Sequence, residues 1–290
     1  MDYLKKTGLW ATVGATVGAS LAVVLCLGGA QADPDKDKLV IDGKEIVTEV
    51  KAPPGSPFTR LYSGWRFRAD ETQALEMDDF ENPAFVAVDA AMDTYAKVDG
   101  TEGKSCSSCH ADVKAFKGLR AGLPRWNPDT KKPETLENLI NECRTTRMGA
   151  KAWKWEAPEM LGMTALIGLQ SRGMPVKVKT DGPMSAWMEK GKKLYYTRVG
   201  QLDMSCANCH EDNYGKMIRA DHLSQGQING FPVYRLKWSG LGSIHRRFKG
   251  CMDNIRAKPY KRGSDEFIAL ELYVASRGMG LSVETPSVRN

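Results

Sequence analysis

The chain has 290 residues and a formal net charge of +6, from 41 Lys and Arg against 35 Asp and Glu. This mild positive charge suits anionic small molecules or acidic protein surfaces as partners. The sequence has no block of basic residues, which argues against nucleic-acid binding. The length is sufficient for two domains that each bury a core.

The first residues predict export. Lys5 and Lys6 precede a long stretch without charged residues, and Ala30-Gln31-Ala32 has the small-x-small pattern of a signal-peptidase site. A permanent membrane anchor is the alternative, because the stretch is near the length that spans a bilayer. We expect residues 1–32 to be a signal peptide and the mature chain to be periplasmic, without a membrane segment.

Four of the six cysteines that remain after residue 32 belong to a repeated motif. Cys106-Ser-Ser-Cys109-His110 recurs one hundred positions later as Cys206-Ala-Asn-Cys209-His210. Each copy is C-x-x-C-H, in which two thiols reach the vinyl groups of one porphyrin and the His ligates the iron. A zinc or redox CxxC is the alternative for one copy, but two copies in an exported chain favour haem. We predict two covalently bound haem c groups, attached through Cys106 and Cys109 and through Cys206 and Cys209, with His110 and His210 as iron ligands.

The segments around the two motifs follow the same order. Apolar residues near a period of 3.6 predict one helix before each motif and another well after it. A Ser-Arg-Gly-Met tetrapeptide follows each later helix, at residues 171–174 and 276–279. This order resembles the class I cytochrome c fold, in which the N- and C-terminal helices cross beside the haem. The four predicted helices cover residues 83–98, 159–170, 185–199 and 265–275.

We therefore expect a mainly α protein of two tandem class I cytochrome c-like domains with an N-terminal extension. Pro175, Gly182 and Pro183 interrupt the helical pattern between the halves. The extension lacks the motif and is expected to pack on the first domain. The predicted division is residues 33–80 for the extension, 81–178 for the first haem domain and 179–290 for the second, which holds the active site.

One lone cysteine lies between the motif and the later helix of each half, Cys143 in the first and Cys251 in the second. They could form a disulfide with each other, be inert buried thiols, or each ligate its own iron. Their equivalent places favour ligation, and a thiolate would lower the haem potential below that of a His/Met site. Met148 and Met252 are the other candidates for the sixth iron ligand. We interpret the remaining residues of these types differently: Met160 and Met163 as core residues, Met174 and Met279 as packing residues, and His222 and His245 as surface or packed residues.

The two lone cysteines differ in their flanking charges. Cations lower the pKa of a thiol and favour the reactive thiolate. Arg247 precedes Cys251 by four residues, which on a helix places both on one face, and its planar guanidinium suits a sulfate-like group. A solvated basic surface is the alternative interpretation. The basic residues near Cys251 are His245, Arg246, Arg247, Lys249, Arg256 and Lys258, whereas those near Cys143 are Arg144 and Arg147.

Two CxxCH motifs, a lone cysteine after each, and the segment Arg247-Phe-Lys-Gly-Cys251-Met closely resemble the SoxA family. These are the diheme subunits of the SoxAX cytochromes of bacterial thiosulfate oxidation, and the resemblance covers essentially the whole chain. It implies that Cys143 ligates the first haem with His110, and that Cys251 ligates the second with His210. It further implies that Cys251 is the active-site cysteine, found as a persulfide, and that Arg247 contacts the sulfur substrate.

The activity that the resemblance implies is that of an L-cysteine S-thiosulfotransferase. Thiosulfate is joined oxidatively to a cysteine of the SoxYZ carrier protein, and two electrons leave through the haems to SoxX, a monohaem cytochrome that forms a heterodimer with the diheme subunit. Two alternatives stay open. A plain diheme electron-transfer cytochrome would have no sulfur chemistry, and a diheme peroxidase would need acid/base groups, for which His245 is the nearby candidate.

Overall fold

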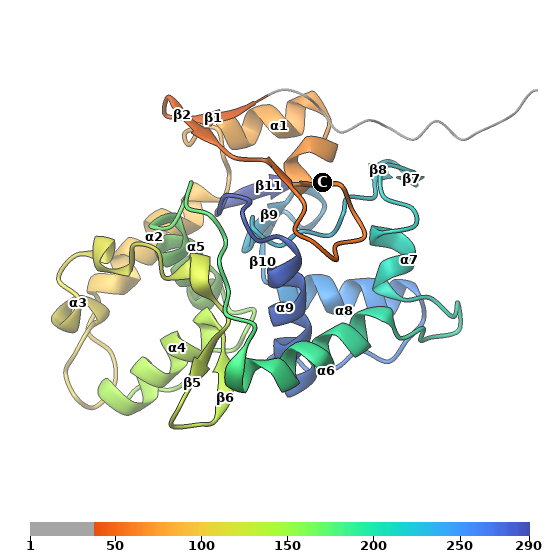
Figure 1. Cartoon of the computed structure of the whole chain (residues 1–290). Coiled ribbons are helices and arrows are strands. Elements are labelled where there is room, and N and C mark those ends of the chain that lie inside the picture. The colour runs from red at the N-terminus through yellow and green to blue at the C-terminus, as the bar shows by residue number, and fades with distance from the viewer. Residues whose placement is uncertain (1–37) are drawn as a thin grey trace, which may run out of the picture. The chain divides into compact units, whose positions relative to one another are not determined.

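Two pairs of crossing helices form the centre of the fold (Figure 1). The computed structural model describes residues 38–290. Helix α2 (Phe85–Ala96) packs against α5 (Pro158–Leu169), and α6 (Ser185–Tyr196) packs against α9 (Asp265–Arg277). These are the four helices that the periodicity predicts, with ends that differ by at most three residues. The predicted signal peptide, its cleavage site and Cys26 lie outside the described residues.

A glycine lies at each helix crossing. A Cβ atom on Gly162 of α5 would approach the Ala87 carbonyl oxygen to 2.8 Å, and one on Gly191 of α6 would approach that of Ala269 to 2.1 Å. The missing side chains therefore let the backbones of each pair come close together. Each pair also has its own hydrophobic core. The described residues nevertheless pack as one compact unit, and the division into two tandem domains stays a prediction.

Short helices carry the cysteines. The motifs form α3 (Cys106–Cys109) and α7 (Cys206–His210). A serine precedes each helix as its N-cap, and its backbone N–H donates to the side chain three residues later. The N–H of Ser105 donates to Ser108 Oγ at 2.9 Å, and that of Ser205 donates to Asn208 Oδ1 at 3.0 Å. Helix α4 (Leu136–Glu142) leads into a π-helical turn at Cys143–Arg147, and α8 (Ile244–Asn254) contains Cys251. Short 3₁₀ helices cover Gly64–Phe67, Val113–Phe116, Arg120–Gly122, Gly182–Met184 and Leu236–Trp238.

The N-terminal segment, residues 38–80, forms two hairpins and helix α1 (Asp70–Met77). Strand β1 (Leu39–Ile41) pairs with β2 (Lys44–Ile46), and β3 (Glu49–Lys51) pairs with β4 (Arg60–Tyr62). Trp65 is fully buried in a small core with residues of the first hairpin. The segment is the orange part of Figure 1, beside the C-terminal strand.

This N-terminal segment contacts both halves of the chain. Its Asp79 pairs with Arg172 of the first half, with the nearer nitrogen and oxygen 2.6 Å apart. In the second half, Ser282 Oγ accepts from the Val47 N–H at 3.1 Å, and α1 packs against the C-terminal strand. We expect the N-terminal segment to pack on the first domain, and the structure shows that it packs on the second half as well.

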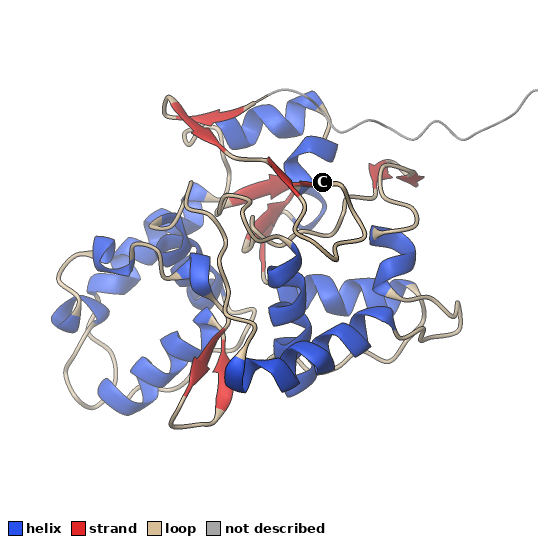
Figure 2. Cartoon of the chain, viewed as in Figure 1, coloured by secondary structure: helices blue, strands red, loops and turns tan. Residues whose placement is uncertain are grey.

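A three-stranded sheet closes the second half (Figure 2). Its central strand β9 (Val233–Arg235) pairs antiparallel with β10 (Gly240–Gly242) and parallel with β11 (Ser287–Arg289). The stretch between α5 and α6 is extended, as its prolines predict, and the Val176 N–H donates to the Leu281 oxygen at 2.8 Å. Two more hairpins pair β5 (Arg125–Asn127) with β6 (Lys132–Glu134) and β7 (Met217–Ile218) with β8 (Asp221–His222).

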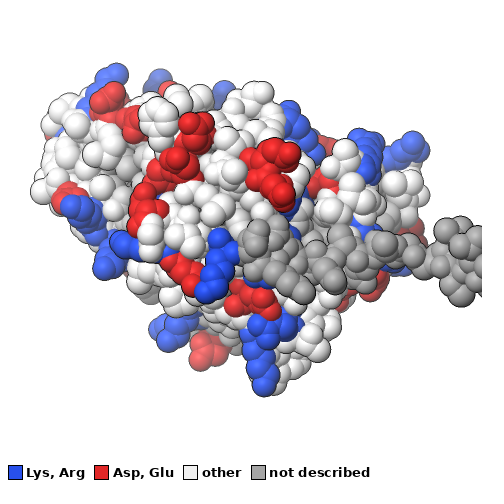
Figure 3. Space-filling model, turned by 90° about the horizontal axis from the view of Figure 1, so that it is seen from above, with Lys and Arg blue, Asp and Glu red and all other residues white. Residues whose placement is uncertain are grey.

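Charged side chains of both signs are interspersed on the face that Figure 3 shows. None of the helices in the described part of the chain has the length and apolar character needed to cross a membrane.

Candidate functional site

The turn before each CxxCH motif packs against the backbone that follows the lone cysteine of the same half. Gly100 and Gly200 have φ angles of +82° and +75°, and a Cβ on them would lie 2.2 Å from the Met148 oxygen and 2.3 Å from the Ile255 oxygen. Only glycine accepts both the left-handed backbone and this approach. The N–H groups two residues later donate to the same oxygens, Glu102 to Met148 at 3.1 Å and Leu202 to Ile255 at 3.3 Å. This contact ties each lone cysteine to its own motif.

Each lone cysteine consequently lies near the thiols of its own motif. Burial, and then the neighbouring Cys143, raise the pKa of Cys106, while burial and Cys251 raise the pKa of Cys209. None of the six described cysteines forms a disulfide. The alternative of a bond between Cys143 and Cys251 is therefore not realised in this structure, and the ligand roles of the two cysteines stay a prediction.

The two lone cysteines have opposite electrostatic environments. Burial raises the pKa of the Cys251 thiol, but Arg247, His210 and Arg235 outweigh it and lower that pKa to about 6. Burial and the neighbouring Cys109 instead raise the pKa of Cys143, in spite of its two adjacent arginines. The thiolate is the nucleophilic form of cysteine, so Cys251 is the more readily ionised of the two lone cysteines.

Three cations surround Cys251, and we call Arg235, Lys237 and Arg247 the basic rim. Arg247 lies one helical turn before Cys251 on α8, and within residues 38–290 its guanidinium makes no hydrogen bond or ion pair. Burial, then repulsion from Arg247, lowers the pKa of Arg235 to about 9. Arg235 is also held by Asp221, with an N–O distance of 3.5 Å. The sequence carries no local signal for Arg235 and Lys237, because only the β9–β10 hairpin brings them to Cys251.

Three basic residues that the sequence places near Cys251 have other partners. The Arg246 guanidinium lies over the Trp238 ring, 4.2 Å from its centroid. Lys249 pairs with Asp253 at 2.6 Å, and Arg256 donates to Gln201 Oε1 at 3.4 Å. Arg247 is therefore the residue of that sequence cluster whose charge is directed to the thiol.

The predicted iron ligand His210 is held by the backbone that follows its motif. Its Nδ1–H donates to the Ser224 carbonyl oxygen at 2.8 Å, which leaves Nε2 for a metal. Gly226 packs on the ring, where a Cβ would lie 2.8 Å from His210 Cγ. Cys251 lies close enough to His210 for a side-chain hydrogen bond to lower its pKa. Two motif thiols, an oriented imidazole and a facing thiolate fit the donor set of a haem c with His/Cys ligation.

The first motif is held differently. The Tyr95 hydroxyl donates to the carbonyl oxygen of His110, and the His110 ring lies beside Phe116 with centroids 4.7 Å apart. Tyr195, at the equivalent place in the second half, has a buried hydroxyl without a hydrogen-bond partner and lies under the guanidinium of Arg277. The repeat therefore preserves the residue types but not their hydrogen bonds.

The remaining predictions for Met and His mostly concern packing. Met160 and Met163 are buried in the first core, and Met174 and Met279 pack at the edge of the second, which confirms both predictions. Met148 is buried, and Met252 packs against the second core.

The two non-motif histidines also have defined surroundings. His245 is fully buried, stacks on Trp155 with centroids 4.9 Å apart and accepts from the Gly263 N–H at 3.0 Å. His222 is partly exposed on β8. The buried His245 gives no support to a peroxidase acid/base group.

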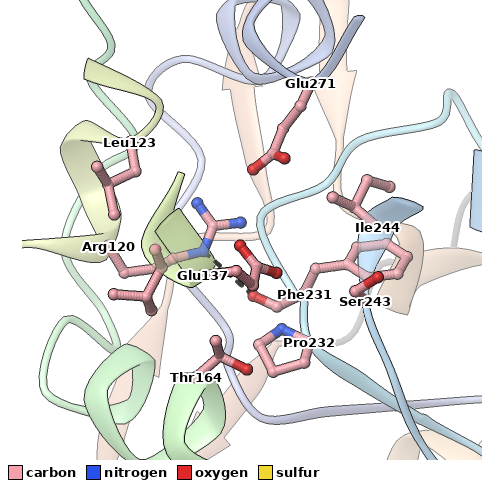
Figure 4. A pocket seen from close by; sticks show the side chains of 10 residues that line it. Arg120, Leu123, Glu137, Thr164, Phe231, Pro232, Ser243, Ile244 and Glu271 are labelled. Atoms are coloured by element: carbon pink, nitrogen blue, oxygen red, sulfur yellow. Dashed lines mark hydrogen bonds between the residues drawn. The ribbon is translucent and has the colours of Figure 1, made fainter. Parts of the chain in front are cut away.

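A small cavity lies at the junction of the halves (Figure 4). Its volume of about 20 Å³ is enough for a water molecule but not for thiosulfate. Arg120, Glu137 and Glu271 direct charged groups into it, and Arg120 Nε donates to the Phe231 oxygen at 3.2 Å. Burial, and then the charge of Glu271, raise the pKa of Glu137. The cavity is a buried polar junction, separate from the cysteine sites.

The fold and the cysteine sites define a c-type cytochrome domain, and comparisons with known proteins give the same class. Residues 90–176 match the family model of the SoxA/TsdA cytochrome c domain. A protein of this class binds haem c covalently.

Several relatives match over nearly their full length. The chain is 53% identical to the L-cysteine S-thiosulfotransferase subunit SoxA of Rhodovulum sulfidophilum, over 94% of this chain and 98% of that protein. It is 53% identical to the subunit of the same name from Paracoccus pantotrophus, over 96% and 98%. The crystal structure of SoxXA from P. pantotrophus matches with a TM-score of 0.86 at 54% identity, covering 89% of this chain and all of that one. The chain belongs to the SoxA family.

Proposed function

We propose that this chain is the catalytic diheme subunit of a periplasmic L-cysteine S-thiosulfotransferase. The observation that carries the proposal is the pairing of Cys251, whose pKa lies at about 6, with the unpaired guanidinium of Arg247 one helical turn away. The names of the relatives, all L-cysteine S-thiosulfotransferase subunits, support the same activity. The signal-like N-terminus supports export to the periplasm.

The residues of the second half divide the chemistry between them. Arg247 binds the sulfonate end of thiosulfate through two parallel hydrogen bonds, and Arg235 and Lys237 add positive charge for the dianion. Cys251, as thiolate or persulfide, is the sulfur that contacts the substrate. Bringing two anionic sulfurs together is unfavourable in water, so the basic rim stabilises the approach by neutralising their charges.

The reaction joins a carrier cysteine to thiosulfate. The carrier thiolate and the terminal sulfur of thiosulfate form one S–S bond, which gives a cysteine S-thiosulfonate and releases two electrons. A thiol substrate also releases its proton. If haem c is bound in this half, Cys251 would be the residue of this site that holds the iron, and the haem would supply the exit for the two electrons.

We further propose two haem c groups in two tandem domains, residues 81–178 and 179–290. His110 and Cys143 would ligate the first iron, and His210 and Cys251 the second. The equivalent glycine turns, Gly100 and Gly200, support this symmetric assignment.

The proposed partners are a SoxX-type monohaem cytochrome, bound as a heterodimer, and a SoxYZ-type carrier that docks transiently. The similarity to the chain of a SoxXA structure supports the first partner. The need to present a thiol to Cys251 supports the second.

The alternative is a plain electron-transfer cytochrome, and Cys251→Met separates the two functions. Methionine can ligate iron but carries no transferable thiol, so the variant should keep both haems and lose thiosulfate-dependent electron release. Cys143→Met is the matched control, because it makes the same change in the half without a basic rim, and should retain turnover. If Cys251→Met couples thiosulfate to the carrier at a near wild-type rate, the electron-transfer function is correct.

A further inference from the structure

We propose that Gln225 is a positioning residue of the second haem site, through which the N-terminal segment orients His210. This inference rests on the part of the proposed function that makes His210 an iron ligand, and it is independent of the sulfur chemistry. Three observations carry it: the bonds of the Gln225 side chain, the contacts of its two neighbours with His210, and the absence of the same arrangement in the first half.

The Gln225 side chain is clamped by strand β4. It is 1% exposed, its Oε1 accepts from the Tyr62 N–H at 2.9 Å, and its Nε2 donates to the Arg60 carbonyl oxygen at 3.1 Å. The amide thus bonds to the backbone on both sides of the buried Leu61. Because donor and acceptor are both used, the side chain has one orientation, and the position of the Gln225 backbone follows from it.

Both neighbours of Gln225 contact the His210 ring. The Ser224 carbonyl, which accepts from Nδ1–H at 2.8 Å, belongs to the planar peptide unit that includes the Gln225 nitrogen. On the other side, Gly226 has a φ of +76° and lies against the ring. A rotation of this backbone would therefore either turn the carbonyl away from Nδ1 or press against the imidazole.

The N-terminal segment holds the same loop at further points. Arg68 pairs with Asp221 and donates to the His222 carbonyl oxygen at 2.8 Å. The rings of Phe58 and Tyr214 meet edge to face with centroids 5.3 Å apart. The loop that supports His210 is therefore fastened to residues more than 140 positions earlier in the chain, and Gln225 is the fastening point next to the ligand.

The first half lacks this arrangement. Among the described residues, no hydrogen bond to the His110 ring is found, and its neighbour is the Phe116 ring. Donation from Nδ1–H raises the basicity of a ligating imidazole and stabilises the ferric state. The clamp therefore lowers the potential of the second haem relative to a site without it.

The test uses the complete diheme protein with Gln225→Met, which keeps the size of the side chain but removes both hydrogen bonds. Redox titration and electron paramagnetic resonance should show a higher midpoint potential and altered low-spin signals for the second haem, with the first haem unchanged. Gln225→Glu keeps the acceptor for the Tyr62 N–H and should give a smaller shift in the same direction.

Gln73→Met is the matched control. Gln73 is also a buried glutamine of the N-terminal segment, and its Nε2 donates to the Trp65 carbonyl oxygen at 3.2 Å, so its hydrogen bond stays within that segment and does not reach residues 224–226. Neither haem should shift in this variant.

An unchanged second-haem potential in Gln225→Met would overturn the proposal, as would an equal shift of both haems or the same shift in Gln73→Met. If Gln225→Met does not assemble, Gln225→Glu decides by the same criteria. A wild-type protein that lacks thiosulfate coupling would contradict the proposed function, but the two haem potentials would still decide the role of Gln225.

Discussion

Arg289 of the C-terminal strand forms a buried ion pair with Glu76 of helix α1. The same guanidinium pairs with Glu284 at 2.6 Å, so one cation serves two buried carboxylates. Glu76 Oε2 also accepts from the Val288 N–H at 2.9 Å, while its Oε1 has no hydrogen-bond partner. This cluster joins the N-terminal segment to the end of the chain and has one carboxylate more than its cation can neutralise.

We expect the stability of this cluster to fall as the pH rises. Burial raises the pKa of Glu76 from 4.5 to about 8, with Glu284 adding to the rise and Arg289 opposing it. The unfolded chain loses this proton at the lower pH and the folded chain at the higher, so the free energy of unfolding declines between these values and then levels off.

Urea unfolding across this pH range measures the effect. Glu76→Gln should remove this part of the pH dependence, because the neutral amide cannot titrate. Glu71→Gln, at an exposed position of the same helix, should follow the wild-type curve. A Glu76→Gln curve parallel to the wild type would show that Glu76 is ionised throughout.

Replacing Gly200 by alanine should disturb the second haem site alone. The added Cβ would meet the Ile255 oxygen, and the left-handed backbone costs a further 1 kcal/mol or so, giving a loss of about 2–4 kcal/mol in stability. Absorption and resonance spectra should change for the second haem, whereas Gly100→Ala should change those of the first. If either variant altered both haems equally, the contact between turn and cysteine would not be local to each half.

Removing the Arg247 guanidinium should weaken transition-state binding. Arg247→Ala should cost about 2–4 kcal/mol of transition-state stabilisation, the scale of one preorganised donor, and this loss is measured as a fall in kcat/KM for thiosulfate. Arg247→Lys should recover part of the loss, since the charge survives but the planar fork does not.

Lys249→Ala is the control for Arg247, because this cation lies on the same helix and is paired with Asp253. Its steady-state kinetics should match the wild type. A loss in Lys249→Ala as large as that in Arg247→Ala would indicate a general effect of positive charge.

Intact-mass measurement of the purified protein should give a chain that starts at Asp33 and carries two covalently bound haems. The expected start follows from the Ala30-Gln31-Ala32 cleavage pattern. The expected haem count follows from the four motif cysteines, which are free of disulfides and lie on capped helices: Cys106, Cys109, Cys206 and Cys209. An added sulfur atom would identify the persulfide. A mass with one haem would contradict the symmetric assignment, and haem lost on acid–acetone extraction would contradict covalent attachment.

The haem-binding motifs, the four long helices and the equivalent places of Cys143 and Cys251 could all be predicted from the sequence. These features depend on short spacings: three residues between the thiols, and a 3.6-residue period for the helices. Gly100 and Gly200 carry the same hundred-residue offset as the motifs, so a search of the repeat could also have found them.

Only the tertiary structure decided which distant residues complete the site. Arg235 reaches Cys251 through the β9–β10 hairpin, and Gln225 meets β4 across more than 160 positions. Three further features likewise depend on how the two helix pairs pack: the burial of His245, the cavity at Glu137, and the contacts of the N-terminal segment with the second half. Such contacts follow from the summed burial and hydrogen bonding of residues far apart in sequence, which no local spacing encodes.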